Sequence, residues 1–477
     1  MAIATVLPRG EAEGAAGMPR APSAEAPVSA VLKVLRPGLC TTVQDLGRPG
    51  FQRYGVPTSG PMDEWGLRVA NALVGNVPAD AALEVTGIGP VVCVRGEAVL
   101  AVAGAEFALD LDGQPVPPFA AFRAREGQVL TFGACRSGVR AYLAAAGGID
   151  VPLVMRSRST CLAGRYGGLE GRPLREGDVL PILERDPAAS GRPFEGRFLP
   201  RRLWPRRSSS VELRVVMGPQ NHLFTPEGIA TFLGSEYRVT THADRMGYRL
   251  DGPRIAHRQG ADIISDATAP GAVQVPGDGR PIVLMGDRQT TGGYTKIASV
   301  IRPDISALAQ GRFGDRVRFR KVSLAEAHAV LAVFLAELQE VQAAVIAPPA
   351  RCTLHVALDG RRRAVEVEEI AGGFLVDVGG REFEVHLAGP EEVGAGPAQV
   401  QSPVPGVVAQ IHVAPGAAVA AGARLVTLLA MKLQHDVIAA APGMVAAVRV
   451  VPGQEVQAGE VLVEMAPASE EGNVELR

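Results

Sequence analysis

Short apolar runs rich in β-branched residues, separated by glycine and proline turns, fill residues 31–347. Few stretches there show the 3.6-residue period of an amphipathic helix. One helix is predicted after Ser323, because Ser323 and Glu326 form a capping box ahead of a periodic apolar stretch. Another is predicted from Pro61 to Leu73, with the proline in its first turn. The pattern therefore predicts a mainly β region with few helices.

The C-terminal region contains an internal repeat. Residues 405–429 align without a gap with residues 442–466, and 12 of these 25 positions are identical. Each repeat consists of short β-branched runs punctuated by Pro-Gly and Ala-Gly turns, which is typical of strands and tight turns. Neither repeat can bury its apolar face alone. We therefore expect a small sandwich made of two related four-strand halves.

Lysine is rare in this chain. Only four of the 48 basic residues are lysines, at positions Lys33, Lys296, Lys321 and Lys432. A general drift toward arginine explains this without reference to function, but a site whose chemistry needs a primary amine resists such drift. Lys432 lies between the two repeats, in their predicted connecting turn.

The segment around Lys432 resembles the biotin-accepting motif of biotin carboxyl carrier domains, usually written Ala-Met-Lys-Met. The matching residues are Ala430, Met431, Lys432 and Leu433, with His435 part of the same turn motif. Residues 402–406 are similar to the Ser-Pro-Met-Pro-Gly strand that opens such domains, with Val404 in place of Met. The resemblance implies covalent biotin on Lys432, attached by a biotin protein ligase. An amide to biotin requires a primary amine, so arginine cannot substitute.

Two other interpretations of Lys432 are open. It can be an exposed lysine on an ordinary hairpin. It can also belong to a lipoyl domain, which shares the fold, but the lipoyl lysine usually lies between Asp and Ala, whereas Met431 and Leu433 stand here. The flanking residues therefore favour biotin.

Strings of polar residues joined to glycines mark residues 31–325, and together they resemble the allophanate hydrolase subunit 2 family. The strings are Thr41–Gly50, Ser59–Asp63, Ala70–Asn76, Ala82–Thr86, Ser157–Thr160, Asp244–Leu250, Gln274–Pro281 and Asp287–Lys296. This family also occurs as the second half of the carboxyltransferase domain of urea carboxylase and as a subunit of bacterial 5-oxoprolinase. The resemblance implies two β-barrel subdomains similar to cyclophilin and a sister subunit of the subunit 1 type. Arg156 and Cys161 depart from the family pattern.

The fold class predicted from these features is mainly β, with two cyclophilin-like β-barrel subdomains, a small β-hairpin module and a C-terminal biotinyl/lipoyl-type flattened β-sandwich. The predicted segments are a disordered N-terminus (1–30), carboxyltransferase subdomain 1 (31–207), subdomain 2 with its terminal helix (208–347), a β module similar to that of acyl-CoA carboxylases (352–387), a linker (388–401), the biotinyl carrier (402–467) and a tail (468–477). The basic stretch 201–210 is interpreted as a solvated joint, with anion binding as the alternative.

The loop from Gln289 to Lys296 is suited to a planar ureido or amide group, because Gln and Thr side chains offer paired donors and acceptors beside two glycines. Lys296 can stabilise an oxyanion or hold a carboxylate. The candidate substrate residues are Gln44, Asp45, Arg48, Asp244, Arg245, Gln274, Asp278, Asp287, Gln289, Thr290, Thr291, Tyr294 and Lys296. Alternatively, the loop is a tight turn, and Gln44, Asp45 and Arg48 form a structural hydrogen-bonded corner. Asp63 is expected to cap a helix.

Composition excludes several functional classes. A formal net charge of −2 lacks the electrostatic footprint of a general nucleic-acid binder. The five cysteines form no CxxC pair, so neither a zinc site nor a disulfide framework is expected, and a cytoplasmic location fits. No metal site and no membrane span are predicted. No ATP-binding motif is found, so ATP and bicarbonate would be used by a partner biotin carboxylase subunit.

The leading hypothesis is a carboxyltransferase and biotin-carrier subunit of an ATP-dependent carboxylase, with carboxybiotin on Lys432 delivering the carboxyl group to urea or a related small amide. One alternative is a subunit of an ATP-dependent 5-oxoprolinase that opens a lactam. Another is a non-catalytic regulator that binds the sister subunit. A regulator has no need of a carrier arm.

Overall fold

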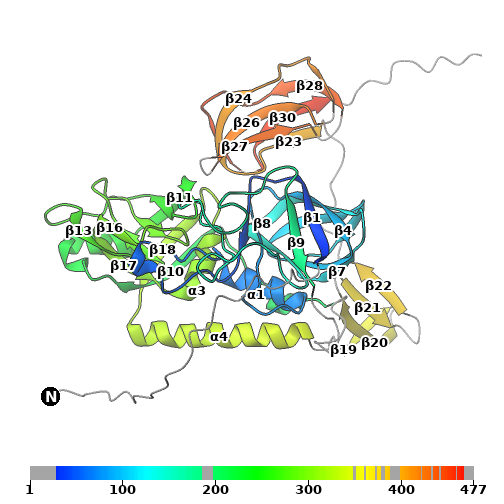
Figure 1. Cartoon of the computed structure of the whole chain (residues 1–477), viewed down its shortest axis with the longest axis horizontal. Helices are drawn as coiled ribbons and strands as arrows, with labels where there is room; N and C mark the ends of the chain where they lie inside the picture. The colour runs from blue at the N-terminus through cyan, green and yellow to red at the C-terminus, as the bar shows by residue number, and fades with distance from the viewer. Residues whose placement is uncertain are drawn as a thin grey trace, which may run out of the picture.

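The computed structural model describes residues 28–184, 197–346, 351–358, 361–370, 373–377, 382–386, 398–420, 422–430, 433–439, 442–457 and 459–466. These residues form a mainly β structure, as predicted. Its main parts are a first half (β1–β9), a second half (β10–β18) and a C-terminal sandwich (β23–β30). Figure 1 shows the two halves side by side, with helix α4 (Leu324–Ile346) along one side of them and the sandwich on the opposite side.

The first half is a nine-stranded half-barrel. Its path β2-β3-β8-β4-β1-β9 is extended by β5, which pairs with β6, β7 and β8. Strand β8 is buried on both faces at its end: Leu143 faces one apolar cluster and Tyr142 faces another that includes helix α1. The elements are β1 (Val28–Arg36), β2 (Cys40–Gln44), α1 (Glu64–Leu73), β3 (Ala82–Thr86), β4 (Val91–Gly96), β5 (Ala98–Leu111), β6 (Gln114–Val116), β7 (Ala121–Ala124), β8 (Val129–Ala145) and β9 (Val179–Leu183).

The second half is a closed barrel of order β10-β17-β14-β15-β12-β11-β18, beside a separate β13-β16 pair. Alternate residues such as Leu213 and Val215 point into its apolar core, as the two-residue period of a strand requires. The elements are β10 (Ser210–Met217), α2 (Pro226–Gly234), β11 (Glu236–Ala243), β12 (Gly247–Asp251), β13 (Asp262–Ala267), β14 (Ala272–Gln274), β15 (Ile282–Leu284), β16 (Thr291–Tyr294), β17 (Lys296–Val300), α3 (Arg302–Ala309) and β18 (Arg316–Lys321).

The helices correct part of the sequence interpretation. Helix α1 begins at Glu64 rather than at Pro61, because the Asp63 carboxylate accepts from the Gly66 N–H and caps it, as expected for Asp63. Helix α4 has the predicted cap, with Ser323 Oγ accepting from the Glu326 N–H at 3.1 Å. Helices α2 and α3 were not predicted.

Helix α4 is long and apolar enough, by length and composition, to cross a membrane. One side of it packs against α1, α3 and β10, and its Val341 and Val345 belong to the same apolar cluster as α1. Other apolar side chains of this helix, among them Leu324, Val333 and Leu335, are exposed.

Beyond α4, the described strands form one meander and one sandwich. The meander is β19 (Arg351–Leu358), β20 (Arg361–Ile370), β21 (Gly373–Asp377) and β22 (Glu382–His386). The sandwich has sheets β23-β30-β28-β25 and β27-β26-β24-β29. Its strands are β23 (Ala398–Gln401), β24 (Gly406–Ile411), β25 (Ala418–Val419), β26 (Arg424–Ala430), β27 (Leu433–Ile438), β28 (Gly443–Val448), β29 (Glu455–Val456) and β30 (Val461–Ala466). Each sheet takes strands from both sequence repeats, so neither repeat is a separate sheet.

Two predicted segment boundaries differ from the strands. Strand β1 begins at Val28, inside the segment 1–30 expected to be disordered, and pairs with β9 from that residue onward. Strand β23 covers residues 398–401, which were predicted to be linker, and pairs with β30. Residues 1–27, 387–397 and 467–477 lie outside the described residues.

Candidate functional site

The predicted biotin-attachment residues fall where β26 connects to β27. Ala430 ends β26, Leu433 begins β27, and the two pair with each other in the antiparallel ladder. Met431 and Lys432 lie outside the described residues. His435 is half-buried on β27, and burial lowers the pKa of its imidazole. The flanking strands therefore have the register of a hairpin with a two-residue connection.

This end of the sandwich rests on the body. Ala430 and Val404 form a small buried cluster with Leu39 of the first half. Gly87 permits the approach, since its φ is +69° and a Cβ at this position would lie 2.8 Å from Val404 Cγ1. A cavity of about 50 Å³ beside the cluster is lined by both halves and by the sandwich. The strand end that precedes Lys432 is thus seated at the seam between the halves.

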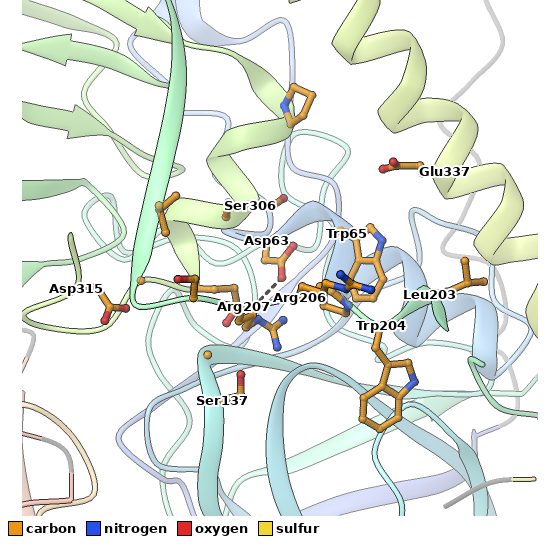
Figure 2. Close-up of a pocket in the computed structure, with 18 of the residues that line it drawn as sticks. Asp63, Trp65, Ser137, Leu203, Trp204, Arg206, Arg207, Ser306, Asp315 and Glu337 are labelled. Carbon is orange, nitrogen blue, oxygen red and sulfur yellow. Dashed lines mark hydrogen bonds between the residues drawn. The ribbon is translucent and has the colours of Figure 1, made fainter. Parts of the chain in front are cut away.

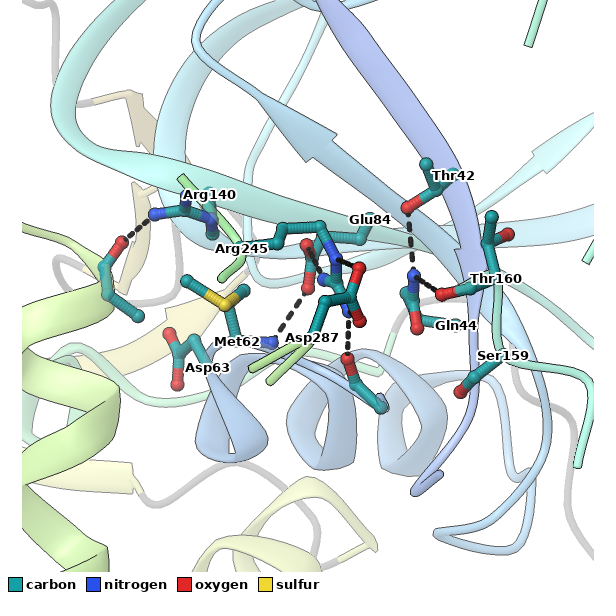
Figure 3. Close-up of polar contacts among 12 residues, drawn as sticks. Thr42, Gln44, Met62, Asp63, Glu84, Arg140, Ser159, Thr160, Arg245 and Asp287 are labelled. Carbon is teal, nitrogen blue, oxygen red and sulfur yellow. Dashed lines mark hydrogen bonds and ion pairs between the residues drawn. The ribbon is translucent and has the colours of Figure 1, made fainter. Parts of the chain in front are cut away.

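A buried ion cluster crosses the same seam. The Arg245 guanidinium of the second half donates to the Glu84 carboxylate of the first half and, at 3.0 and 3.1 Å, to the Asp287 carboxylate. All three side chains are at most 6% exposed. Although burial alone would raise the pKa of Glu84, the charges of Arg245 and Arg140, together with hydrogen bonds from the Met62 N–H and the Tyr142 hydroxyl, hold this pKa below its usual range. Figure 3 shows Arg245 between the two carboxylates.

Arg140 extends the polar contacts. Its guanidinium donates to the Tyr248 hydroxyl and to the Ala309 carbonyl, both in the second half. Tyr142, two residues further along β8, donates to Glu84 at 2.7 Å. The two halves are therefore joined across the seam by the bonds of Arg245 to Glu84 and of Arg140 to Tyr248 and Ala309, which favour one relative position of the halves.

A cavity of about 750 Å³ opens beside this cluster. Its lining residues are Cys40, Thr86, Arg140, Leu162, Ala163, Arg165, Glu170, Gly171, Arg172, Pro173, Arg175, Asp244, Arg245, Met246 and Asp287. Cys40, Thr86 and Arg140 are the chain neighbours of Leu39, Gly87 and Val139, which line the small cavity under Val404. Since adjacent Cα atoms are about 3.8 Å apart, the large cavity lies immediately beside the seat of the sandwich.

The lining has the chemistry to hold an anionic or strongly dipolar group. Five arginines face three carboxylic acids in it. The cavity is large enough for a small molecule together with a tethered group. Burial raises the pKa of the Cys40 thiol to about 11, so this cysteine stays protonated near neutral pH and is no nucleophile.

Gln44, Asp45 and Arg48 form the hydrogen-bonded corner that was one of their two interpretations. Asp45 Oδ1 accepts from the Ser157 and Ser159 hydroxyls, both at 2.6 Å, and Asp45 Oδ2 accepts from the Arg158 N–H. The three side chains hold the loop that continues to Leu162 and Arg165 in the cavity wall, and none of them lines the cavity itself. These three side chains therefore anchor this loop.

Asp45→Ala should lower the free energy of unfolding by roughly 2–4 kcal/mol, because it leaves several buried donors without an acceptor. The loop should also become a substrate for trypsin at the exposed Arg165. Urea denaturation and limited proteolysis check this. Asp278→Ala is the matched control, since Asp278 is an exposed turn residue that accepts from the Arg280 N–H, and it should stay within about 1 kcal/mol of the parent. Equal losses in both variants would contradict a special role for the corner.

The structure divides the candidate substrate residues of the second half into two groups. Asp287 joins the ion cluster, and Asp244 lines the 750 Å³ cavity, where its carboxylate caps the turn at Met246 and Gly247. Gln289 instead donates to Gln274 at 3.2 Å, and the Lys296 ammonium pairs with Asp266 at 2.9 Å.

This second polar group does not line the 750 Å³ cavity. It lies beside the β13-β16 pair, where Thr291 and Tyr294 are exposed. Thr290 takes part through its backbone, since its carbonyl accepts from the Thr268 N–H. The structure therefore brings Asp244, Arg245 and Asp287 together and keeps Gln274, Gln289, Tyr294 and Lys296 apart from them.

Sequence reasoning missed Arg140 and gave Glu84 no role. An available signal was the position of Arg140 in the apolar run 139–146, because a charged residue buried in a strand needs partners. Glu84 was likewise flanked by apolar residues on β3. The partners of Arg140 and Glu84 in the second half lie more than 100 positions away in the sequence, so the sequence did not reveal the ion cluster.

Comparison with known proteins identifies the family. Residues 54–321 match the family model described as carboxyltransferase domain, subdomain A and B. The chain belongs to this family. Residues 398–465 of the carboxyltransferase match the model described as biotin-requiring enzyme, so the C-terminal sandwich is a biotin-carrier domain. The predicted family and fold are thus confirmed.

Relatives of the carboxyltransferase include two kinds of named protein. It is 41% identical over 299 residues to a subunit of the 5-oxoprolinase of Escherichia coli (strain K12), covering 62% of this chain and 93% of that one. It is 35% identical over 308 residues to urea amidolyase of Saccharomyces cerevisiae, covering 61% of this chain but 17% of that one. The K. lactis urea amidolyase structure has a TM-score of 0.62 and 29% identity over 75% of this chain and 23% of that chain.

Proposed function

We propose that this chain is the carboxyltransferase and carrier subunit of an ATP-dependent, biotin-dependent carboxylase acting on urea or a related amide. The observation that carries the proposal is the seating of Ala430, at the strand end preceding Lys432, beside a 750 Å³ cavity lined by arginines. Biotin on Lys432 would supply a transferable carboxyl group to that cavity. A partner biotin carboxylase would use ATP and bicarbonate.

The chain's own residues suit this chemistry. Arg165 and Arg175 are exposed in the cavity lining and can hold a carboxylate or donate to an acceptor oxygen on which negative charge develops. The buried Arg245 is bonded to Glu84 and Asp287 and keeps this wall in place. Asp244 can accept hydrogen bonds from an amide nitrogen. The rigid seam keeps these groups in place before substrate arrives.

A 5-oxoprolinase subunit is the second candidate, favoured by the 41% identity to the E. coli protein over 93% of that chain. The two functions are distinguished by reconstitution with the sister subunit and a biotin carboxylase. The carboxylase function requires urea-dependent ATP hydrolysis that avidin abolishes. ATP-dependent glutamate release from 5-oxoproline, insensitive to avidin, would support the second candidate instead.

Val404→Asp should lower carboxyl transfer at least tenfold while leaving biotin loading unchanged. Val404 is 5% exposed because it contacts the body, and it lies outside the sandwich's own core cluster. A carboxylate there would be desolvated on docking. The measurements are the mass gain from biotin and the rate of transfer. Val451→Asp, at a position 63% exposed on the same sandwich, is the control and should transfer normally. Normal transfer by Val404→Asp would show that this contact is not the productive one.

A further inference from the structure

A second large cavity lies between the two halves and α4. Its volume is about 780 Å³, within the range of small-molecule sites. Its walls come from the start of α1, residues 136–138 of β8, the joint 202–212, α3 and α4. It shares no lining residue with the 750 Å³ cavity. The basic joint, interpreted from sequence as a solvated linker, is therefore built into a cavity wall.

Arg207 is the central basic group of this cavity. Its Nη1 atom is buried and has no hydrogen-bond partner among the described residues. The carboxylate with the largest electrostatic effect on it is Asp63, which is already bonded to the Gln310 amide at 2.6 Å and to the Gly66 N–H. Burial lowers the pKa of Arg207 and raises that of Asp63. Figure 2 shows Asp63, Arg206 and Arg207 together in the cavity.

Three other acidic groups in the lining have partners. Glu212 pairs with Arg320 and Glu340 pairs with Arg202, each through a contact of 2.9 or 3.0 Å. Asp315 accepts from the Arg312 N–H. The lining holds five arginines and five carboxylates. Within the described part of the chain, Arg136, Arg206 and Arg207 make no ion pair, and neither do Asp63, Asp315 and Glu337. The buried Nη1 atom of Arg207 is therefore a donor that the lining itself does not use.

We propose that this cavity binds a small-molecule oxyanion, a carboxylate or phosphate of metabolite size, with Arg207 as its central donor. A buried guanidinium with an unused donor gains most from a charged acceptor, because charge-assisted hydrogen bonds are the strong ones. Trp65 and Trp204 provide an aromatic wall against which the rest of the ligand can pack. The proposal is independent of what the carboxyl acceptor is.

The cavity has a built-in reporter. The chain has two tryptophans, and both line this cavity. Tryptophan fluorescence of the full chain is therefore titrated with pyrophosphate in one arm and citrate in the other, with sodium chloride at matched ionic strength as the blank. A saturable change in tryptophan fluorescence with pyrophosphate identifies a phosphate ligand. The same change with citrate identifies a carboxylate ligand. Calorimetry confirms the dissociation constant.

Arg207→Gln should raise the dissociation constant of the anion that binds at least tenfold. Arg206→Gln, at an exposed position in the lining, should weaken it by a smaller factor, and Arg36→Gln, exposed on β1 and outside the cavity, should bind like the parent. Melting curves verify that the variants are folded. The proposal is overturned if neither anion binds beyond the chloride blank, or if all three variants bind equally.

Discussion

Replacing Lys432 with arginine should abolish biotin loading and every biotin-dependent carboxyl transfer by this chain. A biotin ligase forms an amide with a primary amine, whereas the guanidinium of arginine stays protonated and cannot act as that amine. The measurement is intact mass after co-expression with a biotin ligase and excess biotin. The parent should gain the mass of one biotin, and Lys432→Arg should keep its unmodified mass.

The chain offers a close control for this experiment. Lys321 is exposed on β18, and Lys321→Arg makes the same change at a lysine outside the carrier domain. It should be loaded as fully as the parent. Loading that survives Lys432→Arg would disprove the attachment site. An unloaded parent would remove the carrier role and favour the lactam-opening function.

Arg245→Met should lower the free energy of unfolding by about 3–5 kcal/mol, the usual loss when one member of a buried ion pair is removed. The side chain bridges Glu84 and Asp287 across the seam, so both buried carboxylates lose their main counter-charge. Carboxyl transfer should fall with it, because Arg245 and Asp287 line the 750 Å³ cavity. Urea denaturation followed by circular dichroism measures the first effect.

The stability difference should depend on pH in a defined direction. In the parent, the low pKa of Glu84 means that its carboxylate stabilises the fold above the usual glutamate pKa, and this contribution is lost as pH falls through the folded-state value. In Arg245→Met, burial dominates, the pKa of Glu84 rises above its usual value, and folding takes up a proton. As the pH falls from about 7 to about 4, the deficit in unfolding free energy of the variant relative to the parent should therefore become smaller.

Arg249→Met separates this effect from general loss of charge. Arg249 is exposed on β12, close in sequence to Arg245, and its replacement should change the unfolding free energy by no more than about 0.5 kcal/mol. If Arg245→Met and the parent show parallel pH profiles, Glu84 does not depend on Arg245 as the structure indicates.

Features encoded by short-range patterns were predictable from the sequence. The repeat around Lys432, the Ser323 capping box and the capping role of Asp63 each depend on residues close together in the chain. Helix α2 had a comparable signal, because Thr225 caps it and Pro226 occupies its first turn, but its short length hid it among the strands. Helix α3 has no side-chain cap, so its only start signal is Pro303 in its first turn.

The candidate site was only partly predictable, because its geometry depends on distant pairings. The string from Asp287 to Lys296 looks continuous in the sequence, yet Asp287 turns toward Arg245 while Lys296 turns toward Asp266. In an extended chain, successive side chains point to opposite faces, so neighbours in a motif need not share a site. Gln44 and Asp45 show the converse, since polar residues in a glycine-rich motif serve a loop more than 100 positions away.

The small contact between the carrier and the body sets how long the carrier stays. Val404, Ala430 and Leu39 form its apolar part, and burying one such side chain contributes about 1.5–3 kcal/mol at most. Because the carrier belongs to the same chain, its local concentration at the seam is high without tight affinity. A contact of this strength lets the carrier domain bind the body often and dissociate quickly. An arm that must travel between a loading enzyme and a transfer site needs that combination, since a firmer grip would make departure the slowest step of each cycle.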